Sequence, residues 1–521
     1  MSKTNRTKGG FFTRLLDKIE VVGNKLPQPA TLFAMLMGVV LLLSWIFSGV
    51  SVLRPGTGGA TEFAAEYLEV KNLLTKEGFQ LIFTNMIDEF ASFPPLGLVL
   101  VVMLGIGLAE HSGLIAVALR VFVSKVPKYF ITFSIITAGM ASSVAVDAGY
   151  IVLIPMGGAI FLGMGRHPLA GIAAAFAGVS GGFGANFLPT GIDPMIAAFT
   201  EPAANLIDPE YTVNPLSNYY FMAASVPFVG IVGTWITEKI IVPRLGLYTP
   251  EEGVENEMKN SKVTRLEKRA LLYSFVATVL FIGLILWTII PSDGLLRGDI
   301  DPYSGTASFS PFYDSLVVIM FLVFFIAGLT YGIFAKTVKS DKDVSTMTAK
   351  SMSAMGTYIV IAFFAAQFIA YFNWSNLGSV LAVKGSESLT AIGFTGIPLM
   401  VAFIILSSLV NLVMGSASAK WALMAPIFVP MLMLMGYSPE ITQAAYRVGD
   451  SYSNILTPLL PFFPLVIVYA QKYVRGMGIG TLVALMLPYA IAFMLIRIPV
   501  FIAWVWLELP LGIEGPLFYP N

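Results

Sequence analysis

Two short polar stretches interrupt hydrocarbon-rich segments of this 521-residue chain. The first reads GANFLPTGIDPM, from Gly184 to Met195, and the second reads SNILTPLLPFFP, from Ser453 to Pro464. Proline breaks a helix, and amide, hydroxyl and carboxylate side chains are costly inside a bilayer. Because broken backbone is tolerated at membrane depth only where it is buried in protein or faces water, these stretches predict a polar binding site.

Neutral polar side chains accompany both breaks. Asn186 and Thr190 lie at the first, and Asn454 and Thr457 lie at the second. The N-terminus of a half-helix favours an anion and its C-terminus favours a cation. We therefore expect these amide and hydroxyl groups to stand beside a bound ion or cargo molecule.

Asp450 and Asn411 are the candidates for binding a sodium ion. Sodium is a hard cation, and one carboxylate with amide, hydroxyl and carbonyl oxygens suits it. Asp450 also precedes two serines, Ser451 and Ser453. The alternative is a structural ion pair between Asp450 and Arg447, one helical turn earlier. Both interpretations can hold, because an ion-pair partner can also act as a gate.

Three further residues are candidates for contact with a cargo molecule. The planar guanidinium of Arg447 suits a carboxylate or a sulfonyl group, although it could serve only to neutralise Asp450. Asp193 could carry a proton or face an amine, or it could cap the half-helix that follows. Trp421 could stack on an aromatic ring, whereas many membrane tryptophans are interfacial anchors.

The composition indicates the elements that must position these residues. Hydrophobic residues make up 56% of the chain and charged residues 12%, which is typical of a polytopic helical membrane protein in a lipid bilayer. Lys plus Arg and Asp plus Glu number 31 each, so nothing points to a nucleic-acid partner. No HExxH motif occurs, so a membrane-embedded hydrolase is only a distant alternative to a carrier. No nucleotide-binding P-loop occurs either, which argues against an ATP-driven pump.

Apolar segments give the candidate spans, and several are short or interrupted by Gly and Pro, so half-helices or re-entrant arms are expected among them. The segments lie near 30–53, 94–110, 128–145, 148–165, 168–189, 217–243, 269–291, 313–335, 353–373, 391–414, 421–436, 441–461 and 477–507.

Basic loops predict the orientation in the membrane. Lys and Arg are frequent at the N-terminus, in the 239–269 and 336–350 loops and near 472–475, which we place in the cytoplasm. The 292–312 loop has one Arg against three Asp, and no Lys or Arg follows Arg497. We therefore expect this loop and the C-terminus outside.

An internal repeat is visible between MASSVAVDAGYIVLIPM at 140–156 and MGSASAKWALMAPIFVPM at 414–431. Each is followed by a broken-helix element, NFLPT in the first case and NILTP in the second. Asp147 in the first segment corresponds to Trp421 in the second. The expected topology gives the two units opposite orientations, which is the signature of a secondary transporter with a midplane site. The alternative is chance similarity between helices rich in small residues.

The predicted fold class is therefore an all-α polytopic membrane protein with an ion-transporter-type inverted repeat, two re-entrant helical hairpins and broken helices. The expected divisions are 1–78 for a lead-in, first span and outside loop; 79–243 for the first repeat, with a hairpin at about 140–165 and a broken helix at about 168–205; 244–349 for a cytoplasmic loop and two scaffold spans; 350–475 for the second repeat, with a hairpin at about 400–436 and a broken helix at about 441–470; and 476–521 for the last span and outside tail.

Long motifs resemble one known family. GSASAKWALMAPIFVPMLMLMG, AAYRVGDSYSNILTPLLPF and the ending LPLGIEGPLFYP look like the AbgT family of aminobenzoyl-glutamate transporters, and the resemblance runs nearly end to end. It implies a homodimer in the bacterial inner membrane. It also implies either uptake of p-aminobenzoyl-glutamate or export of sulfonamide antimetabolites, with Na⁺ or H⁺ as the coupling ion and no cofactor.

The resemblance also implies site residues. The family's site positions map onto Asp193, Asn411, Ser418, Trp421, Pro439, Arg447, Asp450 and Pro458. PTGIDPM carries prolines that some relatives lack, which changes the expected geometry around Asp193 but not the acid itself. Lys420 inherits no role. The leading hypothesis is a cation-coupled, elevator-like carrier of aromatic carboxylates, and the alternative is a proton-driven exporter of sulfonamides.

Overall fold

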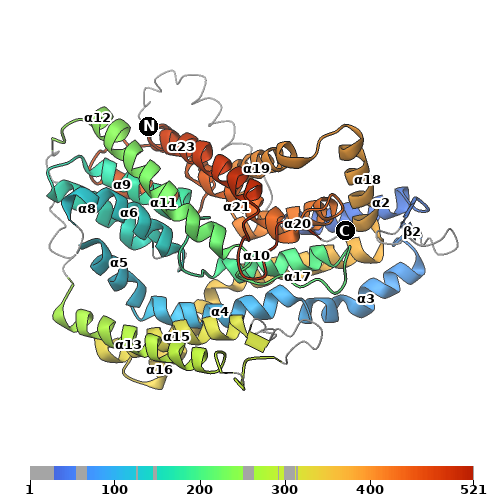
Figure 1. Ribbon diagram of the computed structural model, residues 1–521, viewed down its shortest axis with the longest axis horizontal. Helices are drawn as coiled ribbons and strands as arrows, with labels where there is room; N and C mark the ends of the chain where they lie inside the picture. The colour runs from blue at the N-terminus through green and yellow to red at the C-terminus, as the bar shows by residue number, and fades with distance from the viewer. Residues whose placement is uncertain are drawn as a thin grey trace, which may run out of the picture.

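The computed structural model describes residues 29–53, 67–124, 127–144, 149–249, 263–291, 293–298, 311–312 and 315–519. Asp147 lies outside these ranges. Helices dominate the described chain (Figure 1), which also contains a two-stranded antiparallel sheet of β1 (Ser51–Leu53) and β2 (Tyr67–Glu69).

Seven helical segments of the described chain are long and apolar enough to cross a membrane. They are α3 (Lys76–Ala91) with α4 (Pro94–His111), α11 (Tyr219–Ile236) continued through α12 (Val242–Leu245), α13 (Arg265–Trp287), α15 (Leu316–Ala335), α17 (Gly356–Trp374), α19 (Gly396–Val413) and α23 (Ile479–Trp506). About 20 apolar residues span the hydrocarbon core. The polytopic all-α class is therefore confirmed.

One group of helices forms a separate layer along the lower edge of Figure 1. There α4 packs on α15 and α16 (Asp341–Ala354), and α15 packs on α13. Glycine permits the closest approach, because a Cβ on Gly105 of α4 would lie 2.3 Å from the Phe321 carbonyl oxygen of α15. This layer carries none of the predicted site residues.

The first unit consists of short helical pieces. The arms α6 (Ile131–Ala141) and α8 (Ile154–Gly163) lie on either side of residues 145–148, which are outside the described ranges, and α9 (Pro168–Phe176) follows. With their adjoining turns, these pieces run 131–144, 149–163 and 168–181, too short for complete crossings. A non-helical link at 182–191 then leads to α10 (Ile192–Ala204) and on to α11.

The second unit has the same order of parts. After α18 (Leu377–Ala391), α19 and α20 (Ala417–Met433) form a pair joined by a non-helical link at 414–416. The broken helix follows as α21 (Pro439–Ser453), a short 3₁₀ turn (Asn454–Leu456) and α22 (Phe463–Gln471), and α23 closes the unit as α11 closes the first.

The two units interlock. In Figure 1, α6 and α8 lie toward the left end, whereas the connection between α18 and α19 lies toward the right. Between them, α10 of the first unit packs on α20 of the second, α9 packs on α22, and α11 packs on α23. The broken regions of both units therefore meet near the centre of the molecule.

Two kinds of expectation about element boundaries were wrong. The repeated segment 414–431 itself corresponds to one arm, α20, because the chain turns at 414–416 and the other arm is α19, so the two arms together occupy 396–433 against the expected 400–436. The segment 441–461 is not one span, because α21 ends at Ser453 and α22 begins at Phe463. Four helices were also missed: α3, α16 and α18, in which charged residues lower the apolar character, and α5 (Leu114–Ser124), which has only 11 residues.

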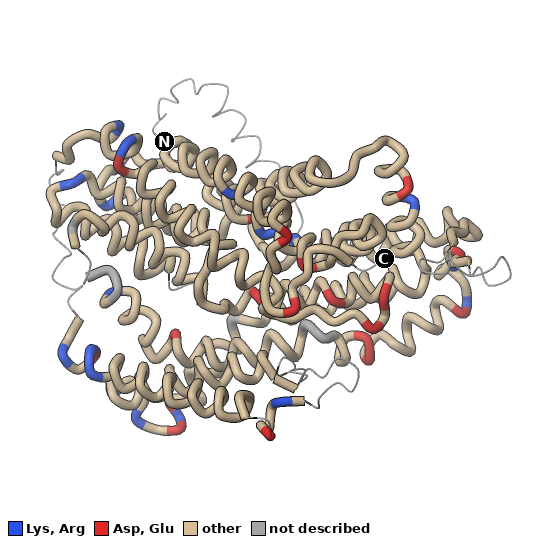
Figure 2. Tube along the Cα trace, viewed as in Figure 1, with Lys and Arg blue, Asp and Glu red and all other residues tan. Residues whose placement is uncertain are grey.

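Charge is distributed unevenly along the molecule (Figure 2). Several Lys and Arg gather near α12, the start of α13 and α16, at the left of the view. Toward the centre and the C-terminus, acidic residues are more frequent. A group of opposite charges also lies in the interior, where α10, α20 and α21 meet.

Candidate functional site

The interior charges come from three helices that are distant in sequence. Asp193 lies in α10, Lys420 and Trp421 in α20, and Arg447 and Asp450 in α21. All five side chains are buried. Charged residues inside a membrane protein are costly and most often functional, so this cluster is the candidate site.

Asp193 has two roles at the start of α10. Its Oδ2 accepts hydrogen bonds from the Thr190 backbone N–H at 2.6 Å and the Thr190 hydroxyl at 3.0 Å, which closes the turn that leads into α10. Its Oδ1 lies 2.6 Å from Nη2 of Arg447 in an ion pair. That contact lacks hydrogen-bond geometry, so it is an attraction of charges without a well-directed bond. Asp193 therefore joins the turn before α10 to Arg447, while the N-cap of α10, Gly191, has no side-chain cap.

The expected pairing of Arg447 with Asp450 is absent from the described structure. Arg447 pairs with Asp193, and Asp450 pairs through Oδ1 with the ammonium group of Lys420. Arg447 and Asp450, both in α21, therefore pair with opposite charges on two different helices. The ion pairs therefore connect α21 to α10 of the first unit and to α20 of the second.

Asn411 holds the second ion pair in place. Its two N–H groups are shared among three acceptors, with Nδ2 at 2.8 Å from the Asp450 carbonyl, 2.7 Å from the Ser453 hydroxyl and 2.9 Å from Oδ1 of Asn454. Its Oδ1 contacts Nζ of Lys420. The amide thus connects the end of α19 to the break after α21 and to the Lys420 side chain.

Trp421 is fully buried one turn into α20 and is neither at a hairpin tip nor at an interface. Its ring stacks on Tyr446 with 4.6 Å between ring centroids. Its Nε1 donates to the Thr200 hydroxyl at 2.9 Å, Thr200 donates to Gln443 at 2.6 Å, and Gln443 donates to Asn218 at 2.9 Å. This chain of side-chain hydrogen bonds fixes the indole between the two units.

The remaining predicted residues lie at helix ends or in the links between helices. Ser418 lies in the first turn of α20, with 3.4 Å between its hydroxyl and that of the N-cap Ser416. Pro439 is the first residue of α21, and Pro458 lies in the link before α22. Asn186 lies in the 182–191 link, where its Nδ2 donates to the Met140 carbonyl at 2.7 Å.

Sequence reasoning missed Arg497. This α23 residue is buried, and its Nη2 donates to the Gly184 carbonyl at 2.6 Å, while its Nε and Nη1 have no hydrogen-bond partner among the described residues. A Cβ on Gly184 would lie 2.7 Å from the Arg447 carbonyl oxygen and 3.0 Å from Nη1 of Arg497, so the first break, α21 and α23 meet here. A charge in the middle of the apolar segment 477–507 was the signal that could have identified it.

Sequence reasoning also missed a polar contact at the start of α21. The phenol of Tyr211, in the loop after α10, donates to Oε2 of the buried Glu440 at 2.9 Å. Burial, with the neighbouring Glu440 charge, raises the pKa of Tyr211 well above its ordinary range. The phenol therefore keeps its proton and remains a donor.

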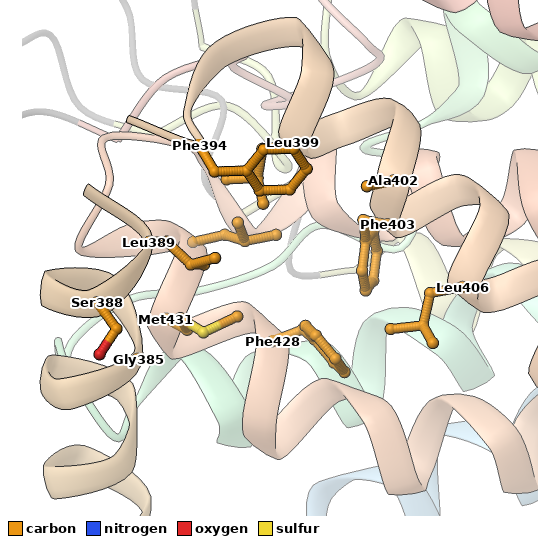
Figure 3. A pocket seen from close by; sticks show the side chains of 11 residues that line it. Gly385, Ser388, Leu389, Phe394, Leu399, Ala402, Phe403, Leu406, Phe428 and Met431 are labelled. Atoms are coloured by element: carbon orange, nitrogen blue, oxygen red, sulfur yellow. The ribbon is translucent and has the colours of Figure 1, made fainter. Parts of the chain in front are cut away.

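The cavity in Figure 3 is not at the charges. It has a volume of about 520 Å³ and lies between α18, α19 and α20, and its walls include Phe394, Leu399, Phe403, Phe428 and Met431. Ser388 brings the only side-chain oxygen to this lining. A carboxylate needs charge-assisted donors, so this cavity is not the place where such a ligand would bind.

Comparisons with known proteins agree with this architecture. The chain matches the model of a family described as the AbgT putative transporter family over residues 14–519. The p-aminobenzoyl-glutamate transport protein of Escherichia coli (strain K12) is 38% identical over 510 residues, which cover 98% of this chain and 97% of that protein.

Two solved structures share the fold. MtrF of Neisseria gonorrhoeae, described as illuminating a class of antimetabolite efflux pumps, matches with a TM-score of 0.90 at 42% identity and covers 98% of this chain and 100% of its own. The YdaH transporter of Alcanivorax borkumensis matches with a TM-score of 0.85 at 40% identity and covers 94% of this chain and 100% of its own.

Proposed function

The chain belongs to the AbgT family of transporters, and from this premise we propose that it is a secondary active transporter of aromatic carboxylates, foremost p-aminobenzoyl-glutamate, driven by a cation gradient. The proteins it resembles are transporters and not enzymes, so the hydrolase alternative is abandoned. The curated relative supports the choice of cargo, because its name specifies this compound.

The observation that carries the proposal is the pair of buried guanidinium groups where the two breaks meet. Arg447 is paired with Asp193, but Arg497 has no carboxylate partner among the described residues. A buried, incompletely bonded guanidinium favours a ligand that supplies carboxylate oxygens, in the bidentate geometry that arginine prefers. The stacked rings of Trp421 and Tyr446 provide an aromatic surface in the same cluster.

The architecture supports an elevator-like movement. The hairpin pairs and broken helices that contain the charges pack on one another, whereas α4, α13, α15 and α16 form a layer without site residues. We propose that the first group moves as a body against this layer. Among the described residues, the ion pairs Asp193–Arg447 and Lys420–Asp450 join helices inside the moving group, so the movement would not break them.

The charge distribution supports an orientation in the membrane. The end formed by α12, the start of α13 and α16 carries clustered Lys and Arg, as cytoplasmic ends do. We propose that this end faces the cytoplasm of a bacterial inner membrane. The N-terminus would then be cytoplasmic and the C-terminus periplasmic, and the family resemblance adds the expectation of a homodimer.

Counterflow in proteoliposomes tests the carrier function. Vesicles loaded with unlabelled p-aminobenzoyl-glutamate should accumulate labelled compound transiently, because a carrier exchanges one molecule for another across the membrane. Uptake should also follow an imposed cation gradient. Absence of both counterflow and gradient-driven uptake in vesicles with correctly folded protein would refute the proposal.

Two variants make this test specific. Arg497→Gln removes the guanidinium charge and should reduce exchange strongly, because the carboxylate loses its charged donor. Lys384→Gln is the matched control, because Lys384 is an exposed residue whose ammonium group pairs with Glu387 at 3.0 Å, away from the charge cluster. The control should exchange at the wild-type rate.

The description of MtrF as one of a class of antimetabolite efflux pumps supports a second candidate, export of antimetabolites, and the family resemblance points to sulfonamides among them. A sulfonyl group offers two oxygens to a guanidinium, so the same cluster suits it. Expression of the chain in a sulfonamide-sensitive host should then raise the inhibitory concentration of the drug. An unchanged inhibitory concentration with good expression would leave import as the direction of transport.

A further inference from the structure

Lys420 is the most deeply buried cation of the cluster. Its relative exposure is 0%, and its ammonium group contacts Oδ1 of Asp450 and Oδ1 of Asn411. These two residues are the ones whose oxygens suggested a sodium site from the sequence. The position between the two oxygens is therefore filled by a positive charge that belongs to the chain itself.

The surrounding hydrogen bonds are arranged for a cation at this position. Three acceptors surround Nδ2 of Asn411, namely the Asp450 carbonyl, the Ser453 hydroxyl and Oδ1 of Asn454. This fixes the amide so that its oxygen faces Lys420. Asp450 thus contacts the Asn411 amide through its backbone carbonyl and the Lys420 ammonium group through its carboxylate.

A free sodium ion does not fit beside this group. To reach the Asp450 carboxylate and the Asn411 oxygen it would have to approach the Lys420 ammonium, and two like charges repel strongly where water is excluded. The Asp450 charge is already balanced, and the Asn411 oxygen is already in contact with a cation. The residues present therefore disagree with a sodium site at Asn411 and Asp450.

We propose that Lys420 is a covalently held replacement for a coupling sodium ion, so that transport by this chain requires no sodium. The inference rests on the proposed function, because it concerns the ion requirement of the same site. Lys420 is a positioning residue in this arrangement. It joins α20 to α19 and α21, and Trp421 follows it directly in sequence.

The first test measures the wild-type protein. Uptake of p-aminobenzoyl-glutamate under a fixed proton gradient should be the same when external sodium is replaced by choline. The thermal unfolding temperature of the purified protein without substrate should also be the same with sodium or choline. A sodium-dependent increase in either quantity would overturn the inference.

The second test removes the tethered cation. Lys420→Ala exposes the Asp450 and Asn411 oxygens to one another and leaves space for an ion, so sodium should raise its unfolding temperature and restore its uptake, by about tenfold or more over choline. Lys384→Gln, which removes a lysine at the surface, should show no response to sodium. A folded Lys420→Ala protein that transports equally well without sodium would contradict the inference.

The two proposals fail in different ways. If Lys420→Ala does not fold, the wild-type measurements decide the inference alone. If the wild-type protein moves no p-aminobenzoyl-glutamate under any gradient, the proposed function fails, while the unfolding temperatures without substrate still decide whether sodium binds. If transport occurs but needs sodium, the proposed function stands and the role of Lys420 is refuted.

Discussion

The two broken regions have the same order of parts but stabilise their breaks in different ways. In the first, the Asn186 amide donates to the Met140 carbonyl of its own hairpin arm, a neutral hydrogen bond of 2.7 Å. In the second, Asn454 accepts from Asn411, whose oxygen contacts the ammonium group of Lys420. The asparagine of the first break thus makes a neutral hydrogen bond, although Asp193 and Arg497 also reach that break at Thr190 and Gly184. The asparagine of the second break is tied directly to the Lys420–Asp450 pair.

The difference shows how one architecture can support two tasks. A neutral amide satisfies exposed backbone and costs little to bury when it is hydrogen-bonded. A buried ion pair carries a large desolvation cost, and its retention is easiest to explain where the charge is used. We therefore locate the ion-dependent part of transport in the second unit, with the first unit contributing Asp193 and the Gly184 junction.

Breaking the charged arrangement should have the largest effect. Asp450→Asn leaves the Lys420 ammonium buried without its counter-charge, and removing one partner of a buried pair costs about 3–5 kcal/mol. Thermal unfolding in detergent should show a markedly lower midpoint. The double variant Lys420→Met/Asp450→Asn should recover much of the loss, because no unpaired charge remains. An unchanged midpoint in Asp450→Asn would mean that the pair contributes nothing to stability.

Arg447→Ala comes next in size and tests the link between the units. Loss of a charge-assisted contact costs on the order of 1.5–3 kcal/mol, so binding of p-aminobenzoyl-glutamate should weaken roughly tenfold to a hundredfold. Isothermal titration of the purified variant measures this. A double-mutant cycle with Asp193→Asn separates lost cargo contact from the broken ion pair. Wild-type affinity in the folded variant would place the carboxylate contact elsewhere, with Arg497 the next residue to test.

Asn186→Ala should have a smaller effect, because only a neutral hydrogen bond is lost. An unsatisfied buried carbonyl costs about 1–3 kcal/mol, so the unfolding midpoint should fall less than in Asp450→Asn. Uptake should remain independent of sodium, and its dependence on the proton gradient should stay as in the wild type. A change in ion dependence would contradict the assignment of the first break to a structural role.

Trp421→Phe should have the smallest effect of the series. Phenylalanine keeps a ring against Tyr446 but loses the 2.9 Å hydrogen bond to Thr200. We expect about 0.5–1.5 kcal/mol of lost stability and affinity together. Trp421→Ala, which also removes the ring, is the comparison that separates stacking from hydrogen bonding. Equal affinity in both variants would show that the cargo ring does not stack here.

Much of the fold could be predicted from the sequence. Apolar segments identified the membrane class, and the matched pairs of Gly- and Pro-rich stretches fell on two units with the same order of parts, while the long motifs gave the family that the comparisons confirm. Boundaries were less accurate because proline did not mark them. Pro426 and Pro430 lie within α20 without ending it. The chain turns instead at Gly415, where a Cβ would lie 2.3 Å from the Leu459 carbonyl oxygen.

The composition of the cluster could be predicted better than its pairing. Asp193, Arg447 and Asp450 were candidates because charges in apolar segments are rare, and the structure brings them together from two distant units. Their partners could not be read from spacing, since Arg447 and Asp450 are neighbours on one helix yet pair across to α10 and α20. Contacts between helices depend on how the helices pack, and one sequence alone contains no record of that. The roles of these residues in transport remain predictions.

The ion pair between Asp193 and Arg447 has a consequence for the order of membrane insertion. Asp193 is synthesised long before Arg447, so α10 reaches the translocon without its counter-charge. A lone carboxylate in an apolar segment disfavours insertion into the bilayer. We therefore expect the start of α10 to reach its stable place only after α21 has emerged from the ribosome, which would make assembly of the first broken helix a late step that requires the second unit.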